Sequence, residues 1–286
     1  MGGTTHSIQE LELIANDIRE DIIKTLEHAG SGHSAGPLGL ADIFTALYFD
    51  ILKYDPKRPN WSERDLLLLS NGHCVPVQYV TMAHAGYFDK KELLTLRKFG
   101  SRLQGHPERT KLPGLETTSG PLGCGLSQAC GMSLAMRMNK ESHRWVYVVM
   151  GDGELDEGNI WEAAMLASKY NLSNVIGFID RNNIQIDGPT ESVMPLEDLA
   201  AKWEAFGWHV LEIDGNNIES IIDAAAMGRA NTAKPTMIIA HTVPGKGVDF
   251  MEYDFTWHGK PPDHEQAKKA LHELRTLGGK IRSEHQ

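Results

Sequence analysis

The sequence predicts an α/β fold in which a doubly wound, parallel sheet is flanked by helices. Short apolar runs alternate with helix-periodic segments along the chain, which is typical of parallel strands joined by crossover helices. Two of these runs, at 145–150 and 174–179, are followed at once by polar residues or glycine. Because ligands bind beyond the carboxyl ends of parallel strands, we expect the functional site there. The chain shows no repeat or linker, so we expect one domain over residues 1–286.

The amino-terminal part is predicted to begin with an amphipathic helix over 7–28. Ser7 and Glu10 have the spacing of a capping box, and apolar residues recur at helical spacing after them. A loop of small residues precedes a second helix over 37–50, where Pro37 suits the first helical position. The elements predicted next are a buried strand at 65–70, helical segments at 77–85 and 90–99, a long loop at 100–120 and a glycine-rich helix at 122–138.

The remaining part is predicted to continue this alternation. A helix over 155–170 joins the two apolar runs, so that they become neighbouring strands of one unit. The elements predicted after it are a helix at 196–206, a strand at 208–213, a helix at 218–230, a strand at 236–241, a glycine-rich loop at 244–247, an aromatic segment at 250–257 and a helix at 266–277.

Composition excludes several classes of protein. The net charge of −10 and the pI of about 5.7 argue against a nucleic-acid-binding protein, which needs a basic face. No apolar run is long enough to cross a bilayer, and the first residues lack the basic and apolar regions of a signal peptide. The three cysteines, Cys74, Cys124 and Cys130, have no metal-binding spacing, so we expect free thiols in a cytoplasmic protein.

The polar residues after the two apolar runs predict a site for Mg²⁺ and a diphosphate. Asp152 supplies a carboxylate and Asn182 a neutral amide oxygen, and Mg²⁺ is commonly held by one or two such groups together with phosphate oxygens. Gly151 and Gly153 allow the backbone to approach a phosphate at the start of the following helix. For Asp152 considered alone, an ordinary Gly-Asp-Gly turn is the alternative.

The other acids of this turn are assigned a lesser role. Glu154 and Asp156 are expected to complement the dipole of the following helix rather than to bind a ligand. A Mg²⁺-dependent phosphohydrolase with Asp152 as nucleophile is disfavoured, because such enzymes usually carry a second Asp two residues further on. This chain has Glu154 there.

Histidines indicate acid–base chemistry. The candidates, which lie beside glycine at the ends of segments, are His33, His73, His106 and His258. A single histidine is more often a surface or core residue, but several at such positions in a parallel-sheet protein indicate a shared site. Imidazole exchanges protons near neutral pH. His241, at the end of a predicted strand, is a weaker candidate.

The spacing of the acid and the amide resembles the thiamine diphosphate motif, in which Gly-Asp-Gly, a helix and an apolar strand are followed by Asn-Asn. In that family the Asp, the Asn and a backbone carbonyl two residues beyond it bind Mg²⁺. The resemblance therefore implies Asp152, Asn182 and the carbonyl of Ile184 as the metal ligands.

Further segments resemble those of transketolases, in the family's order and over nearly the whole chain. The matching segments are Gly32-His33 with Gly36-Pro37-Leu38-Gly39, Ser70-Asn71-Gly72-His73, Gly105-His106-Pro107-Glu108, the run from Thr118 to Gly125, and Trp257-His258-Gly259-Lys260-Pro261. The chain departs from the family at Ser34-Ala35, where Pro-Gly is usual, and at Cys124, which replaces Gln.

The resemblance to transketolase implies roles for these residues. The histidines at 33, 73, 106 and 258 would bind hydroxyls of the donor and acceptor sugars and serve proton transfer. The residues implied for cofactor binding are His73, Gly120, Leu122, Gly151, Asp152, Gly153, Asn182 and Ile184. Leu122 and Ile184 would be apolar walls for the cofactor's rings, with an ordinary core position as the alternative. Lys246 lies where related enzymes have a loop that closes the site, and a solvated lysine is its alternative.

The resemblance ends before the pyrimidine-binding and C-terminal domains of longer transketolases. In that family the later domains supply the glutamate that activates the aminopyrimidine and the arginines that hold the sugar phosphate. We therefore expect the N-terminal subunit of a split transketolase, which transfers a two-carbon ketol unit from a ketose (phosphate) to an aldose (phosphate). Its expected partner is a C-terminal transketolase subunit, with self-association into an assembly of two copies of each chain.

Other interpretations of the resemblance stay open. The chain is also consistent with a subunit of another thiamine diphosphate enzyme, deoxyxylulose-phosphate synthase-like or 2-oxo acid dehydrogenase-like. A homologue that has lost its activity is disfavoured, because Asp152, Asn182 and the histidines are all present.

Overall fold

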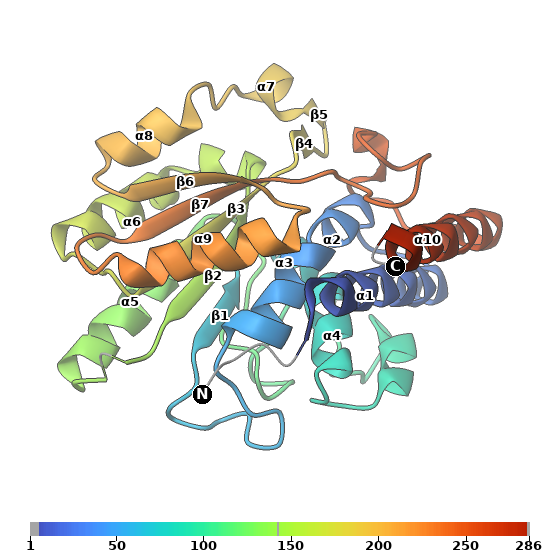
Figure 1. Cartoon of the computed structure of the whole chain (residues 1–286), viewed down its shortest axis with the longest axis horizontal. Helices are drawn as coiled ribbons and strands as arrows, with labels where there is room; N and C mark the ends of the chain where they lie inside the picture. The colour runs from blue at the N-terminus through green and yellow to red at the C-terminus, as the bar shows by residue number, and fades with distance from the viewer. Residues whose placement is uncertain (1–5, 142, 285–286) are drawn as a thin grey trace.

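A computed structural model describes residues 6–141 and 143–284 and confirms the predicted α/β architecture (Figure 1). Five strands form one parallel sheet in the order β1, β2, β3, β7, β6. Their bounds are Leu66–Leu69 for β1, Val146–Gly151 for β2, Val175–Arg181 for β3, His209–Asp214 for β6 and Thr236–His241 for β7. Each strand lies close to its predicted range.

Helices cover both faces of this sheet (Figure 1). The helices that share the core of one face are α1 (Ile8–Ala29), α3 (Ala41–Ala46), α4 (Val75–His84) and α9 (Ile218–Ala230). Those of the other face are α5 (Cys124–Met138), α6 (Gly158–Lys169) and α8 (Leu199–Ala205). The last helix, α10 (His264–Glu284), lies along α1, so the two ends of the described chain pack together.

Alternate residues of each strand enter different cores. In β2, Tyr147 and Val149 belong to the core under α1, whereas Val146 and Val148 belong to the core under α5. All of these side chains are fully buried. A strand that is buried on both faces has a continuous apolar run, and this explains why the runs show no alternation with polar residues.

The beginning of α1 confirms the predicted capping box. The backbone N–H of Glu10 donates to the Ser7 hydroxyl at 3.2 Å, and the backbone N–H of Ser7 donates to the Glu10 carboxylate at 2.6 Å. Two donors that the first helical turn leaves unpaired are thereby satisfied. Gly30 ends the helix with a φ of 65°, a conformation that glycine adopts without strain.

The segment predicted as one helix over 37–50 was predicted wrongly. It is divided into α2 (Ala35–Gly39), α3 and a π-helical turn at Leu47–Ile51. Glycines in α2 make close tertiary contacts there: a Cβ added to Gly39 would lie 2.9 Å from the carbonyl oxygen of Val243. Such packing against a distant segment leaves no periodic signal in the sequence.

Other boundaries also differ from those predicted. The helical segment predicted at 90–99 is a short 3₁₀ turn at Lys90–Thr95, and α10 extends beyond its predicted range at both ends. The remaining short elements are 3₁₀ turns at Gly72–Cys74, Gly153–Asp156 and Phe255–Trp257, a hairpin of β4 (Ile184–Gln185) and β5 (Gly188–Pro189), and α7 (Thr190–Val193). The hairpin and α7 were not predicted.

The described residues agree with the composition on two points. The three cysteines are free thiols, and Cys74 and Cys130 are buried. Within residues 6–141 and 143–284, no helix has both the length and the apolar character needed to span a bilayer.

Candidate active site

A cavity of about 310 Å³ lies beyond the carboxyl ends of β1, β2 and β3. It brings together the four main histidine candidates and every residue implied for cofactor or metal binding. These lining residues are His33, His73, His106, Gly120, Leu122, Gly151, Asp152, Gly153, Asn182, Ile184 and His258. They come from loops that are far apart in the sequence, and the parallel sheet gathers those loops at one edge.

Three of the histidines contact one another. The ring centroids lie 4.8 Å apart for His33 and His73, 5.1 Å for His73 and His258, and 5.6 Å for His33 and His258. His106 lines the same cavity. The loop after α1, the turn after β1 and the turn before α10 therefore present a joint imidazole wall.

The histidines of this wall are neutral at neutral pH, because their surroundings lower the pKa of each ring. Burial, together with the neighbouring His258, Arg97 and His106, lowers the pKa of His33 to about 4. Burial and the neighbouring histidines also hold the pKa of His73 well below its usual value, and burial lowers the pKa of His106 and of His258. At neutral pH each ring thus keeps one nitrogen that accepts and one that donates a hydrogen bond.

Several residues that line the cavity have a buried polar atom without a partner among the described residues. These atoms are Nδ1 of His33, Nδ1 of His258, Oδ1 of Asn71 and Nε2 of Gln185. An unpaired buried donor or acceptor costs about 1–3 kcal/mol. Such atoms in a cavity are suited to bind a polar ligand.

Asp152 follows β2 and is almost completely buried. One carboxylate oxygen accepts from the backbone N–H of Gly153 at 2.7 Å, and the other accepts from the N–H of Asn183 at 2.8 Å. Arg181 forms an ion pair with it at 3.1 Å, which the sequence did not predict. Burial raises the pKa of Asp152, and the Arg181 guanidinium opposes that increase.

Asn182 follows β3, and its side chain is held on both sides. Its oxygen accepts from the backbone N–H of Ile184 at 3.0 Å, and its nitrogen donates to Asp180 at 2.9 Å. Asp180 is fully buried, and burial raises its pKa to about 7. Asp180 lines the cavity and was not predicted as a site residue, although the polar residues at the end of β3 were the signal for it.

The donor set at these strand ends suits Mg²⁺. Asp152 offers a carboxylate, Asn182 an amide oxygen and Ile184 a backbone carbonyl, all of which are oxygen ligands. In the part of the chain that the structure describes, no group of three or more His, Cys, Asp and Glu side chains is arranged to hold a metal. A site with one carboxylate does not need such a group, because phosphate oxygens and water complete the octahedron.

Glu154 corrects a prediction. Its side chain does not lie on the surface beside a helix end but is buried and lines the cavity. Its carboxylate accepts from the backbone N–H groups of Gly123 at 2.7 Å and Gly151 at 3.0 Å, and from the hydroxyl of Ser70. One carboxylate thus joins the loops after β1 and β2 to the loop before α5. Asp156, by contrast, is exposed.

Two weaker candidates lie away from the cavity lining. His241 is half-exposed at the end of β7 and pairs with Glu212 at 3.0 Å. Lys246 lines a different surface pocket, beside α10. Among the lining residues that the sequence did not indicate, Gln185 and Ile186 belong to the β4–β5 hairpin region, which has no periodic signal.

Comparisons with known proteins agree with this geometry. The family described as "Transketolase, thiamine diphosphate binding domain" matches residues 11–277. The chain is 41% identical over 278 residues to one subunit of an apulose-4-phosphate transketolase from Phocaeicola vulgatus, and the match covers 97% of this chain and 98% of that relative. It is 42% identical over 269 residues to one subunit of a 6-deoxy-6-sulfo-D-fructose transketolase from a Clostridium species, and that match covers 94% of this chain and 98% of the relative.

A solved structure shows the same fold. The transketolase of Campylobacter jejuni superposes with a TM-score of 0.89 at 36% identity, over 94% of this chain but 43% of that one. The chain therefore spans nearly the whole of the two relatives named as subunits and less than half of this longer enzyme.

Proposed function

This chain belongs to the family of the transketolase thiamine diphosphate-binding domain, and we propose that it works as the N-terminal subunit of a two-chain transketolase. Relatives of the same length are named as transketolase subunits, which favours ketol transfer over the chemistry of another thiamine diphosphate enzyme. The observation that carries the proposal is that one cavity is lined by the four main histidine candidates together with all the residues expected to bind the cofactor and the metal. We treat residues 1–286 as one domain and, given the free thiols, as a cytoplasmic protein.

The strand-end residues are proposed to hold the diphosphate through Mg²⁺. Asp152 would give the charged ligand, with the Asn182 oxygen and the Ile184 carbonyl as neutral ligands. A divalent cation beside Asp152 favours its ionised form, which burial alone disfavours. A Cβ added to Gly151 would lie 3.7 Å from Asn71, and one added to Gly153 would lie 3.4 Å from Gln185, so side chains here would contact lining residues of the cavity.

The imidazole wall is proposed to handle the sugar. Thiamine diphosphate, when bound, supplies the carbon nucleophile that carries the two-carbon unit. The neutral rings of His33 and His258 each offer an unpartnered Nδ1, which can exchange hydrogen bonds or a proton with a sugar hydroxyl. His73 and His106 lie beside them and can donate to an oxygen on which negative charge develops. Leu122 and Ile184 provide apolar lining for the rings of the cofactor.

The proposal includes a second chain. The Campylobacter jejuni transketolase is more than twice as long as the part that this chain matches, and we infer that a C-terminal subunit supplies the remainder, in an assembly with two copies of each chain. The substrates would be a ketose and an aldose, with or without phosphate. The sugars named for the two relatives differ from each other, so they do not identify the sugar used here.

Two measurements test the proposal. Calorimetry should detect binding of thiamine diphosphate to the chain in the presence of Mg²⁺ and much weaker binding when the metal is chelated. A coupled ketol-transfer assay should show activity only after the C-terminal subunit is added. Full activity of the chain by itself would contradict the two-chain proposal, and absence of Mg²⁺-dependent binding would contradict the cofactor assignment.

A further inference from the structure

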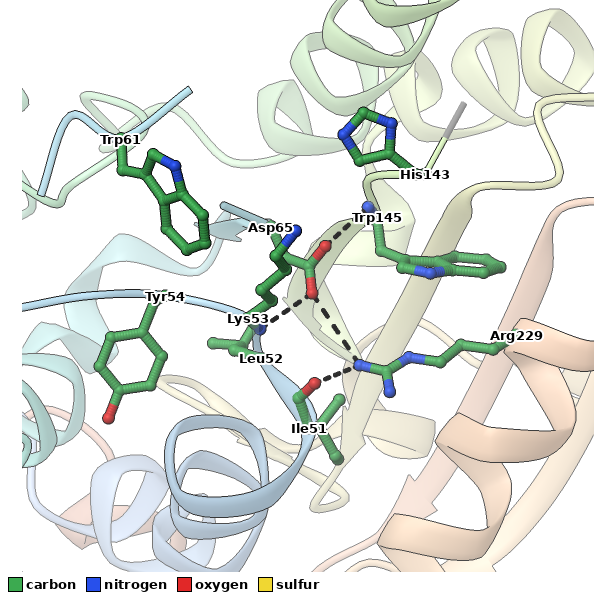
Figure 2. A pocket seen from close by; sticks show the side chains of 9 residues that line it. All are labelled: Ile51, Leu52, Lys53, Tyr54, Trp61, Asp65, His143, Trp145 and Arg229. Atoms are coloured by element: carbon green, nitrogen blue, oxygen red, sulfur yellow. Dashed lines mark hydrogen bonds and ion pairs between the residues drawn. The ribbon is translucent and has the colours of Figure 1, made fainter. Parts of the chain in front are cut away.

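A second pocket, of about 450 Å³, lies at the opposite edge of the sheet, where β1 and β2 begin (Figure 2). Asp65 and Trp145 directly precede these two strands. The lining residues are Ile51, Leu52, Lys53, Tyr54, Trp61, Asp65, His143, Trp145 and Arg229. None of them lines the cavity at the carboxyl ends, so the two sites are separate.

Asp65 forms the centre of this pocket, and both of its carboxylate oxygens accept hydrogen bonds. One carboxylate oxygen accepts from the backbone N–H of Trp145 at 2.9 Å, and the other accepts from the N–H of Lys53 at 3.0 Å. Arg229 lies 4.0 Å from the second oxygen (Figure 2). These contacts explain why a buried acid is present: it joins the segment before β1 to the beginning of β2.

Arg229 is held in a fixed orientation. Its Nε donates to the hydroxyl of Tyr147 at 2.6 Å, and one terminal nitrogen donates to the carbonyl of Ile51. Its other terminal nitrogen has no acceptor among the described residues. Because the guanidinium is half-buried and already oriented, it loses little conformational freedom when it binds an anion.

The other free polar groups of the lining are also donors. The ammonium of Lys53 lies 5.0 Å from the ring centroid of Trp61, and no described carboxylate pairs with it. The indole N–H groups of Trp61 and Trp145 have no acceptor within residues 6–141 and 143–284. His143 is already engaged by Glu63, and the hydroxyl of Tyr54 points away from Asp65 and Arg229 (Figure 2).

We propose that this pocket binds a small anion that carries a flat ring, such as a nucleoside monophosphate. Lys53 and Arg229 would hold the anionic group, because guanidinium and ammonium groups form strong hydrogen bonds to phosphate. The indole faces of Trp61 and Trp145 would stack on the ring. The volume falls within the range of small-molecule sites.

The proposal is tested with three probes on the full chain, with and without thiamine diphosphate and Mg²⁺. Adenosine monophosphate contains both the anion and the ring, inorganic phosphate only the anion, and adenosine only the ring. We expect calorimetry to show adenosine monophosphate binding at least about tenfold more tightly than either fragment. Its affinity should be the same with and without the cofactor, because the cavity at the carboxyl ends is not involved.

Variants separate the two parts of the pocket. Lys53→Gln should weaken adenosine monophosphate and phosphate about tenfold each, since it removes one cation from an exposed position without breaking an ion pair. Trp61→Leu should weaken adenosine monophosphate and adenosine but leave phosphate unchanged. Lys169→Gln is the matched control, because Lys169 also contacts an aromatic ring, that of Tyr170 at 5.4 Å, but on α6.

Three results would overturn the proposal. The first is no binding of adenosine monophosphate at millimolar concentration. The second is equal affinity in the wild type and Lys53→Gln, which would place the anion elsewhere. The third is loss of binding when thiamine diphosphate is added, which would place the nucleotide in the cofactor cavity.

Discussion

The two edges of one sheet carry opposite chemistry. The cavity at the carboxyl ends is lined by glycines, neutral imidazoles and an Asp–Asn pair that follow β2 and β3. The pocket at the amino ends is lined by a lysine, an arginine and two tryptophans around a carboxylate whose oxygens are already engaged. Both edges contain a buried aspartate, Asp152 and Asp65, and burial raises the pKa of each.

A comparison of these two aspartates shows that burial of a carboxylate does not by itself indicate a functional site. Asp65 joins two strand starts through backbone N–H groups and faces a guanidinium, so folding alone explains it. Asp152 has similar contacts, but its surroundings include unpartnered atoms of Asn71, Gln185 and the histidines. Polar atoms that folding leaves unpaired are therefore a better indication of a functional site than a buried charge.

The largest effect that separates the two edges is expected for Asp152→Ala. Removal of the only charged ligand proposed for Mg²⁺ should weaken thiamine diphosphate binding by about 100-fold or more, as measured by calorimetry. Asp65→Asn should leave that binding unchanged, because Asp65 lies at the other edge. Retained cofactor binding in Asp152→Ala would remove the basis for the metal assignment.

Glu154→Ala is expected to lower the free energy of unfolding by about 3 kcal/mol. The substitution leaves the buried N–H group of Gly123 and the partly buried N–H group of Gly151 without an acceptor. Urea unfolding measures this change, and Asp156→Asn, in the same turn but exposed, should stay within about 0.5 kcal/mol of the wild type. Equal stability of the two variants would show that Glu154 does not join the loops.

Two glycines of the α5 segment should respond in opposite directions to alanine. Gly123 has a φ of 81°, and a Cβ there would lie 2.0 Å from Oδ1 of Asn159, so Gly123→Ala should destabilise by about 2 kcal/mol. Gly131 lies inside α5 with nothing within 4 Å of an added Cβ, so Gly131→Ala should stabilise by about 0.5–1 kcal/mol. Thermal and urea unfolding of both variants checks the sign of each change.

Because the histidines of the imidazole wall are buried as neutral rings, we expect the free energy of unfolding to decrease in acid. The pKa of His33 is lowered from 6.5 to about 4, so its folded form resists protonation, and stability present above pH 6.5 is lost as the pH falls towards 4. Between pH 7 and pH 5, His33→Gln should lose about 1–2 kcal/mol less than the wild type. Urea unfolding over this range provides the measurement, with the exposed His272→Gln as control. An unchanged slope in His33→Gln would contradict the burial of a neutral ring.

The smallest effect is expected for Lys53→Gln, which should change neither the stability of the chain nor the binding of thiamine diphosphate at the carboxyl ends of the strands. Lys53 is exposed and pairs with no described carboxylate, so stability should stay within about 0.5 kcal/mol and thiamine diphosphate affinity should not change. Only the binding of adenosine monophosphate and phosphate in the pocket at the amino ends of the strands should weaken. A change in cofactor affinity would show that the two edges are coupled.

Much of the site could be predicted from the sequence, because its residues lie in short segments with a recognisable local pattern. The apolar runs of β2 and β3 and the polar residues after them are local features, and parallel pairing places their carboxyl ends together. The histidine segments occur in the family's order along the chain, so the sequence is sufficient to show the resemblance. The division of the helix over 37–50 and the β4–β5 hairpin could not be predicted, because glycine packing and short pairings give no periodic signal.

The sequence by itself determined the fold class, the polar residues at the strand ends and the set of histidines, since these follow from periodicity and from motifs of a few residues. Only the tertiary structure decided that three imidazoles touch, that Arg181 faces Asp152, and that Glu154 joins three loops rather than capping a helix. It also revealed the pocket around Asp65. The physical reason is that burial and the pairing of polar atoms depend on segments distant in the chain, which no local pattern records.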